Sequence, residues 1–533
     1  MVGADDDADA HRAVAAAADM AGGRLGGERR LRRAGQHLGG GEDLPHRHLQ
    51  QRQAAEAARA VALAARGELT RARRGADRGA DGWRRTMERS TTSPLRVWFA
   101  VAALALPLAA VPAPPPWSPS DACERDVAFA LPELEKRCAA LIESKGLEWR
   151  KIAAEITANA KAARDDSDHL LVLLQLLARL NDGHAEVIPL EAGKGIELPE
   201  PQRGERAGPG LFFCKAGGKL LVKNAWGSAA AAGVKPGMEV VKVDGKPALP
   251  WLAARTAELR DTASWSSDQQ ALFATCHWGL AFKPGTRLEL ELKDVKGKKL
   301  TRTVQCDKAS QVPDGPAFLP PGLEVAKDLK WGKTAGGFGY LHLRRCPSDL
   351  PEQVDRALAA IGAVPGLILD FRGNGGGGFD HDAFMGRFVP SGKTLAFGKS
   401  YPSAGPNPYG GPIVVIIDGN VRSAGETGSG IFKEDGRAFV IGESATAGMS
   451  AQKEQFDLPS GKWALYVAVG SNKGRFNGGK GIEGIGVPPH EQVEFKAKDL
   501  DAGVDTLIAR AEELLKKFPQ AKVPYDPKAF DWK

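Results

Sequence analysis

Ser423 is placed where a hydroxyl could act as a nucleophile. It lies in the run Asp418-Gly-Asn-Val-Arg-Ser423-Ala-Gly-Glu426, five residues after a predicted buried strand and at the start of a predicted helix. That position falls at the carboxyl edge of a parallel sheet, where α/β proteins hold their sites. The unpaired amides of a helix start can also face a developing oxyanion. Taken alone, however, a serine at a helix start is usually just a helix cap.

A glycine-rich run follows a second predicted buried strand. Asp370-Phe-Arg-Gly-Asn-Gly-Gly-Gly-Gly378 lets the backbone approach a ligand closely, because glycine has no side chain. Donors to an oxyanion, a phosphate cradle and a flexible turn are the three interpretations. The run fits neither GxxxxGK[ST] nor a strand–GxGxxG–helix unit well.

Two further motifs complete an ordered set of four. Gly442-Glu-Ser-Ala-Thr-Ala-Gly448 and Gly481-Ile-Glu-Gly-Ile-Gly-Val-Pro-Pro489 follow the first two on one predicted α/β unit. Together the four resemble the S41 peptidases, which include the C-terminal processing (tail-specific) peptidases, the tricorn core and the retinoid-binding-protein-like modules. The resemblance covers about 125–517. It implies Ser423 as the nucleophile, with amides near Gly375, Gly376 and Ala424 as the oxyanion hole.

The group that activates the serine differs from the processing-peptidase pattern. That branch carries a lysine directly after the glycine of the third motif, where this chain has Met449. A thioether accepts no proton at neutral pH. Lys453 is nearby, but four residues along a strand are about 13 Å, so we do not expect it to substitute.

A histidine from the N-terminal region is the expected base. The resemblance implies that Asp182-Gly-His184 corresponds to the Asp-x-His motif of the tricorn-like branch, and Glu483 to its downstream acid. The tricorn core has a serine where this chain has Gly183, which leaves a complete four-residue constellation open. A neutral imidazole is a suitable general base for serine. His381, just beyond the glycines, is the rival base.

Hydrophobic patterning divides the remainder of the chain into three predicted domains. Residues 124–190 have helical periodicity and carry His184. Residues 207–308 contain Ser228-Ala-Ala-Ala-Ala-Gly-Val-Lys-Pro-Gly-Met-Glu-Val-Val-Lys-Val-Asp-Gly245 and resemble a PDZ domain, which implies binding of an extended peptide as an added strand. A PDZ-like fold that only packs against the catalytic part is the alternative. Residues 320–518 alternate apolar strands with helices, which predicts a mainly parallel, covered sheet.

The expected fold class is therefore α/β. Its catalytic core would be ClpP/crotonase-like, as the resemblance implies, with a helical N-terminal region and an inserted PDZ domain, and residues 519–533 would form a C-terminal tail. The expected function is an exported serine endopeptidase acting on extended protein or peptide tails. The alternative is an inactive protein that binds peptides or hydrophobic ligands on the same scaffold. A phosphate- or acyl-CoA-binding enzyme is a third possibility, disfavoured by the PDZ-like insert and the Asp-Gly-His motif.

The N-terminal region differs in composition from the rest of the 533 residues. Residues 1–86 hold 16 Arg, no Lys and 12 acidic residues, which indicates a disordered extension or a segment upstream of the true start at Met87. Residues 87–113 have the basic start and apolar stretch of a secretory signal. We expect export to the periplasm or the extracellular space, with an uncleaved membrane anchor as the alternative.

Cofactors and nucleic acid are not expected partners. The net charge of +7 comes largely from residues 1–86, so the near-neutral body gives no argument for nucleic-acid binding. The six cysteines show no metal-ligand spacing; buried thiols and structural disulfides are the two interpretations. We therefore expect no metal and no cofactor. The oligomeric state does not follow from the sequence.

Overall fold

The computed structural model describes residues 118–307, 315–396, 399–470 and 472–517. The predictions for residues 1–86, 87–113 and 519–533 fall outside these ranges. In the described part of the chain, no helix is both long and apolar enough to cross a membrane.

Four helices open the described chain. Asp165 caps the last of them by accepting a hydrogen bond from Asp168 N, and the helix buries most of its leucines, as its apolar sequence predicts. The helices are α3 (Pro119–Arg137), α4 (Ala139–Ser144), α5 (Trp149–Ala162) and α6 (Asp166–Arg179).

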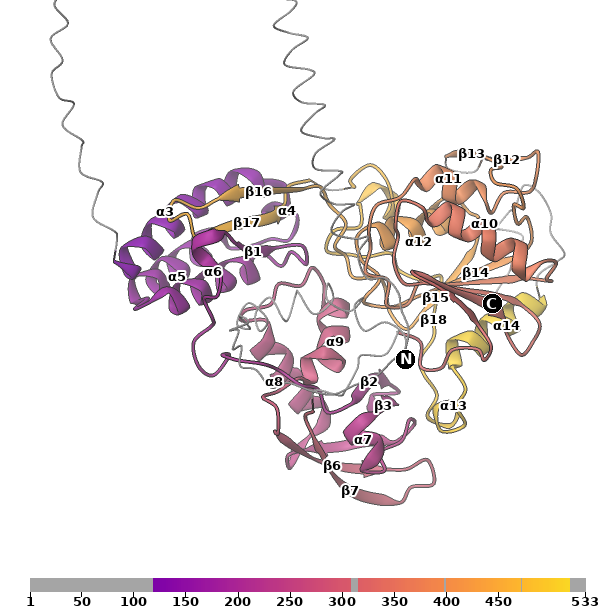
Figure 1. Cartoon of the computed structure of the whole chain (residues 1–533), viewed down its shortest axis with the longest axis horizontal. Coiled ribbons are helices and arrows are strands. Elements are labelled where there is room, and N and C mark those ends of the chain that lie inside the picture. The colour runs from indigo at the N-terminus through magenta and orange to yellow at the C-terminus, as the bar shows by residue number, and fades with distance from the viewer. Residues whose placement is uncertain (1–117, 308–314, 397–398, 471, 518–533) are drawn as a thin grey trace, which may run out of the picture. The chain divides into compact units, whose positions relative to one another are not determined.

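A sheet built from distant parts of the chain completes this helical region. Strand β1 (Glu186–Pro189) pairs antiparallel with β17 (Trp463–Ala468), which pairs with β16 (Lys453–Asp457). Figure 1 shows these late strands in orange among the indigo helices. Trp463 and Leu465 share one apolar core with helices α3, α5 and α6. The predicted domain boundary at residue 190 therefore separates β1 from β16 and β17, although these strands form one sheet.

Residues 207–307 form an antiparallel sheet with helices, which we call the insert. Leu288, Leu290 and Leu292 alternate into its core, as the strict alternation of that segment predicts. Its strand order is β2-β3-β4-β6-β7, and β5 pairs with β4. The elements are β2 (Leu211–Ala216), β3 (Lys219–Ala225), α7 (Gly227–Ala231), β4 (Glu239–Val243), β5 (Lys246–Pro247), α8 (Ala248–Leu259), α9 (Asp268–Cys276), β6 (Arg287–Lys293) and β7 (Lys299–Gln305).

A seven-stranded sheet carries the four motifs. Its order is β18-β15-β14-β11-β10-β9-β8; the pairings from β18 to β10 are parallel, and β9 and β8 join antiparallel. The strands are β8 (Glu324–Ala326), β9 (Leu329–Lys333), β10 (Gly339–Leu343), β11 (Leu367–Asp370), β14 (Ile413–Ile417), β15 (Phe439–Gly442) and β18 (Glu491–Gln492).

Both faces of this sheet are covered, which explains why β14 is apolar throughout and β11 is apolar up to Asp370. One core includes side chains of α10 (Leu350–Ile361), α11 (His381–Gly386) and α12 (Ala424–Glu434). The other includes α14 (Thr506–Lys517) together with Cys214 and Leu221 of the insert. The short α13 (Ala497–Asp501) precedes α14, and the hairpin β12 (Thr394–Ala396)–β13 (Ser400–Pro402) lies between α11 and β14 in the chain.

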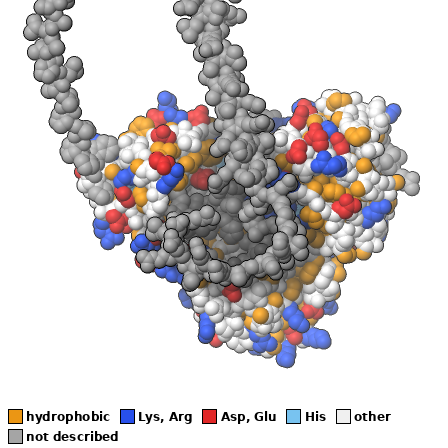
Figure 2. Space-filling view, in the orientation of Figure 1, with side chains coloured by type: hydrophobic (Ala, Val, Ile, Leu, Met, Phe, Trp, Pro, Cys, Tyr) orange, Lys and Arg blue, Asp and Glu red, His pale blue; other side chains and the backbone are white. Residues whose placement is uncertain are grey.

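All six cysteines lie in the described residues and are buried free thiols. Of the two interpretations, the structure therefore shows buried thiols. On the face seen in Figure 2, charged side chains of both signs are interspersed outside the grey atoms.

Candidate active site

Ser423 has a backbone conformation that is costly for any residue other than glycine. Its φ is 54° and its ψ is −124°, at the sharp turn between strand β14 and helix α12. Non-glycine residues in such conformations persist only where the surrounding structure fixes them, and they cluster at functional sites. A nucleophile on a strained strand-to-helix turn is presented above the sheet edge.

Glu426 fixes that turn from the first turn of α12. Its buried carboxylate accepts hydrogen bonds from Ser423 N (3.2 Å), Thr446 Oγ1 (2.6 Å), Gly448 N (2.7 Å) and Met449 N (2.8 Å). Burial raises the pKa of Glu426 to about 8, although these donors favour the carboxylate. The motif that contains Ser423 and the motif that ends at Gly448 are thereby joined at the side chain of Glu426.

The glycine run lies directly against the serine. A Cβ on Gly376 would stand 2.8 Å from Ser423 Cβ and 3.4 Å from Ala424 N. The φ of Gly376 is also 80°. The position therefore requires glycine both for space and for backbone conformation.

The amides expected in the oxyanion hole differ in their availability. Gly375 N donates to Arg344 O (3.0 Å), and Gly376 N donates to Asn374 Oδ1 (2.8 Å). Ala424 N donates to no acceptor among the described residues. In this arrangement Ala424 is the available donor, and Gly375 or Gly376 could serve only if its present bond opened or were shared.

His184 lies with Asp182 and Glu483. Their ligand atoms all fall within 4.8 Å of one another, and His184 Nδ1 is 3.9 Å from Asp182 Oδ1. Asp182 also accepts from His184 N (2.9 Å) and from Ala468 N (2.8 Å). Both ring nitrogens of His184 are buried without a hydrogen-bond partner among the described residues. The imidazole is therefore positioned through its backbone and retains acceptor capacity.

The surroundings of His184 favour the neutral ring. Burial lowers the pKa of His184 to about 4; Asp182 opposes this shift, and Lys453, Arg422 and Lys145 add to it. A ring that is neutral at pH 7 can accept a proton.

Glu483 is held by three donors. Lys145 Nζ and Ser266 Oγ bond its Oε1 at 2.8 Å each, and Ser450 N bonds Oε2 at 3.1 Å. Burial raises the pKa of Glu483, and the nearby Lys145 lowers it. The carboxylate therefore belongs to a fixed network beside His184.

Met449 bridges the histidine and serine segments. Its carbonyl accepts from Ser423 N (3.1 Å), and its Sδ lies 2.8 Å from where a Cβ on Gly183 would stand. Gln270 Nε2 is 2.9 Å from the same sulfur. Packing against Met449 therefore requires glycine at position 183. Met449 lies between the segment that carries His184 and the segment that carries Ser423.

The rival bases have other surroundings. His381 Nε2 lies 2.6 Å from Thr427 Oγ1, and the ring packs on Phe379 at 4.2 Å between centroids. Lys453 begins β16, where it pairs with Ala468. Neither has a hydrogen bond to Ser423 among the contacts of the described residues, and the ring of His184 has none either.

Glu426 is a site residue that the sequence motifs did not predict. The signal was present, because serine followed three residues later by glutamate is the capping-box pattern. Lys145 and Ser266, in contrast, reach Glu483 from segments without a motif, so no spacing rule could have found them.

Asp182, His184 and Glu483 also form a group that could hold a metal ion. Lys145 bonds Glu483 directly, and Lys453 and Arg422 lie near enough to lower the pKa of His184. The positive charge of these three side chains opposes the binding of a metal cation. The group therefore fits a role in proton transfer better than a role in metal binding.

Known peptidases resemble this chain in sequence. The sequence model of peptidase family S41 matches residues 337–493. The C-terminal processing peptidase, chloroplastic, of Tetradesmus obliquus is 26% identical over 341 residues, which are 60% of this chain and 67% of that protein. Tricorn protease homolog 1 of Streptomyces coelicolor is 27% identical over 209 residues, 36% of this chain but 18% of that protein.

A solved structure shows the same fold. Mature CPAF complexed with lactacystin aligns with 75% of this chain and 98% of its own, at a TM-score of 0.53 and 15% identity. The predicted α/β class is confirmed in its coarser form, as a mixed α/β fold. The chain is a serine-type peptidase.

Proposed function

We propose that this chain is an exported serine endopeptidase that hydrolyses peptide bonds in extended protein tails, with Ser423 as nucleophile, His184 as base and Glu483 as supporting acid. The observation that carries the proposal is the strained conformation of Ser423 at the start of α12. Glu426 and Met449 fix its amide, and a non-glycine residue persists in such a conformation only where the surrounding structure fixes it.

The chemistry follows from the charges at the site. Neutral His184 takes the hydroxyl proton as Ser423 Oγ attacks the scissile carbonyl carbon. The oxyanion faces Ala424 N, and Gly376 N joins it once its bond to Asn374 opens. Protonated His184 then gives its proton to the leaving amine, and water releases the acyl group with His184 again as base.

The insert is proposed to be a PDZ domain that binds the substrate tail. Its Gly-Val-Lys-Pro-Gly motif and its antiparallel sheet support the proposal. An extended peptide would join the sheet as an added strand, with side-chain pockets giving selectivity. The C-terminal processing peptidases among the relatives make a protein tail the expected substrate.

A fluorophosphonate probe and an unstructured peptide test the proposal. The wild type should be labelled at Ser423 and should cleave the peptide, and Ser423→Ala should lose both properties. Ser400→Ala, at an exposed serine, should keep both. Peptide cleavage by Ser423→Ala at the wild-type rate would remove Ser423 as the nucleophile.

The alternative is an inactive ligand-binding protein on the same scaffold. The engaged amides of Gly375 and Gly376 favour it, because an oxyanion would meet one free donor. A folded wild type that neither reacts with the probe nor cleaves peptides would support this alternative.

A further inference from the structure

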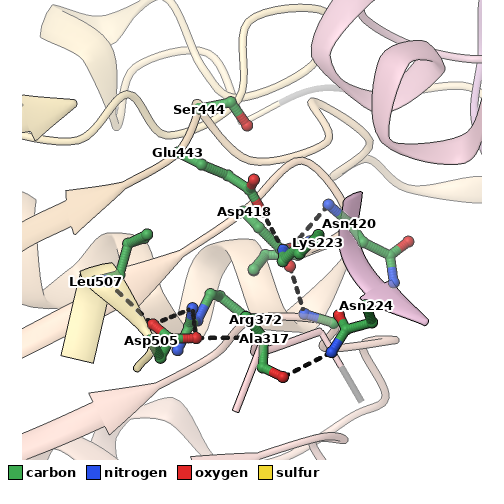
Figure 3. A network of polar contacts seen from close by, with 12 residues as sticks. Lys223, Asn224, Ala317, Arg372, Asp418, Asn420, Glu443, Ser444, Asp505 and Leu507 are labelled. Atoms are coloured by element: carbon green, nitrogen blue, oxygen red, sulfur yellow. Dashed lines mark hydrogen bonds and ion pairs between the residues drawn. The ribbon is translucent and has the colours of Figure 1, made fainter. Parts of the chain in front are cut away.

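The insert places one fully buried cation against the part of the chain that carries the seven-stranded sheet. We call that part the catalytic half. Lys223 of strand β3 has no exposed side-chain surface, and its Nζ lies 2.8 Å from Glu443 Oε1 (Figure 3). The ammonium also packs on the rings of Phe212 and Phe495, at 4.4 and 4.6 Å from their centroids. Burial of a lone ammonium is unfavourable, so Lys223 depends on its partner across the contact.

That partner begins a catalytic loop. Glu443 directly follows β15 and is the second residue of the motif that runs from Gly442 to Gly448. Asp418, at the end of β14, is close enough that Glu443 raises its pKa and Lys223 lowers it, although burial is the main cause of its rise to about 6. Asp418 Oδ2 accepts from Gly373 N (3.0 Å). Lys223 therefore lies where the carboxyl ends of β11, β14 and β15 meet.

The loop that Glu443 begins leads to the serine. Gly448 N and Met449 N donate to Glu426, and Met449 O accepts from Ser423 N at 3.1 Å. A displacement of Glu443 would thus be transmitted to the backbone of Ser423 through residues 444–449 of this loop.

The next residue of β3 makes a second connection. Asn224 Nδ2 donates to Ala317 O (2.6 Å), and Ala317 N donates to Asp505 Oδ2 (2.8 Å). Asp505 pairs with Arg372 (2.9 Å), and Arg372 pairs with Asp370 (2.6 Å) at the start of the glycine run. Figure 3 shows both connections entering the catalytic half from neighbouring residues of one strand.

We propose that Lys223 is a positioning residue for the active site: by pairing with Glu443, the insert sets the loop that holds the amide of Ser423. Buried ion pairs seldom add net stability over apolar residues, and fixing one arrangement is their best-attested role. This inference rests on the proposed function for its effect on catalysis, but the effect on the loop stands independently.

Hydrogen exchange tests the loop directly. In Lys223→Met, the amides of residues 444–450 should exchange about tenfold faster than in the wild type, since coupling through such contacts is commonly of this size. Lys219→Met removes a lysine from the same strand that pairs with Glu239 at the surface, and should leave exchange in this loop unchanged.

Kinetics provide the second readout. Lys223→Met should lower kcat about tenfold with little change in KM, because the serine and not substrate binding is displaced. Glu443→Gln keeps an acceptor for Lys223, so it should fold and show a smaller effect of the same kind. Unchanged loop exchange and kcat in both variants, even with a lower Tm, would overturn the positioning role. Faster loop exchange in a protein whose wild type cleaves nothing would support the positioning role and reject the peptidase function.

Discussion

At the scale of single residues, the space around Ser423 leaves no room for a side chain on Gly376. A methyl group there would stand 2.8 Å from Ser423 Cβ, on a backbone with φ of 80°. We expect Gly376→Ala to reduce kcat/KM at least about a hundredfold, since small misplacements at a reacting centre have effects of this order.

Gly378→Ala is the matched control from the same run of glycines. A Cβ on Gly378 meets no atom within 4 Å, and its φ is not positive. Peptide hydrolysis by this variant should be close to that of the wild type. Equal losses in the two variants would mean that the run acts through flexibility and not through contact with Ser423.

The pH dependence of hydrolysis should report the neutral state of His184. Because burial lowers its pKa to about 4, kcat/KM should fall on acidification near pH 4 and not near 6.5. Asp182 opposes that shift, so Asp182→Asn should move the acid limb lower still. Steady-state kinetics between pH 3.5 and 8 would check both positions, and an acid limb near 6.5 in the wild type would contradict the assignment.

Lys453→Met separates the two basic candidates. Lys453 lowers the pKa of His184 by its charge, so its removal should raise the acid limb and preserve most of kcat. A loss of activity in Lys453→Met that equals the loss in His184→Ala would instead make Lys453 the base.

The residues of the candidate site were only partly predictable from the sequence. The resemblance to the S41 peptidases implied Ser423, His184 and Glu483 as one set. The ligand atoms of His184 and Glu483 lie within 4.8 Å of one another, and the role of the set stays a prediction. The hydrogen bonds of Gly375 and Gly376 could not be predicted, because their acceptors, Arg344 O and Asn374 Oδ1, depend on loop conformation.

At the scale of elements, the start of α12 depends on one buried carboxylate. Glu426 receives four donors from two segments of the chain, Ser423 and residues 446–449. In Glu426→Gln one oxygen becomes an NH₂ group that faces donors, and leaving buried donors unpaired costs about 1–3 kcal/mol. We expect a lower free energy of unfolding by this amount and a large loss of kcat, measured by denaturant unfolding and peptide hydrolysis.

Wild-type behaviour in Glu426→Gln would have a definite meaning. It would show that Glu426 is protonated in the folded protein, in line with its raised pKa, because glutamine mimics the neutral acid. Thr427→Ser, one position along and half-buried, is a conservative control that keeps a hydroxyl near His381.

The elements themselves were largely predictable. Continuous apolar runs gave β11 and β14, and alternation gave β6, because a strand's pattern reports which of its faces are covered. The pairing of β17 with β1 was not predictable, since no local pattern encodes a partner that lies 270 or more residues away in the chain.

At the scale of the whole molecule, the N-terminal helices depend on a hairpin from the catalytic half. Trp463 is fully buried among them, and β17 ends at Ala468, whose amide anchors Asp182 beside the base. Trp463→Ala should lower the free energy of unfolding by about 3–5 kcal/mol and also reduce kcat under conditions where the variant is folded.

Phe129→Ala is the control for this prediction. Phe129 lies in α3 near the same hairpin but is 40% exposed, so its removal should change stability by no more than about 1 kcal/mol. Unfolding of the two variants by denaturant, with kcat measured below the transition, separates the effects. Full kcat in folded Trp463→Ala would show that Asp182 does not need the hairpin.

The buried thiols can report when each apolar core of this chain opens. Each of the four apolar cores holds at least one cysteine: Cys346 in the first, Cys276 in the second, Cys123 and Cys138 in the third, and Cys214 in the fourth. An alkylating reagent can reach such a thiol only when its core opens. Mass spectrometry of a pulse-alkylated sample would therefore give the order in which the cores of the native sequence come apart, with no label or substitution introduced.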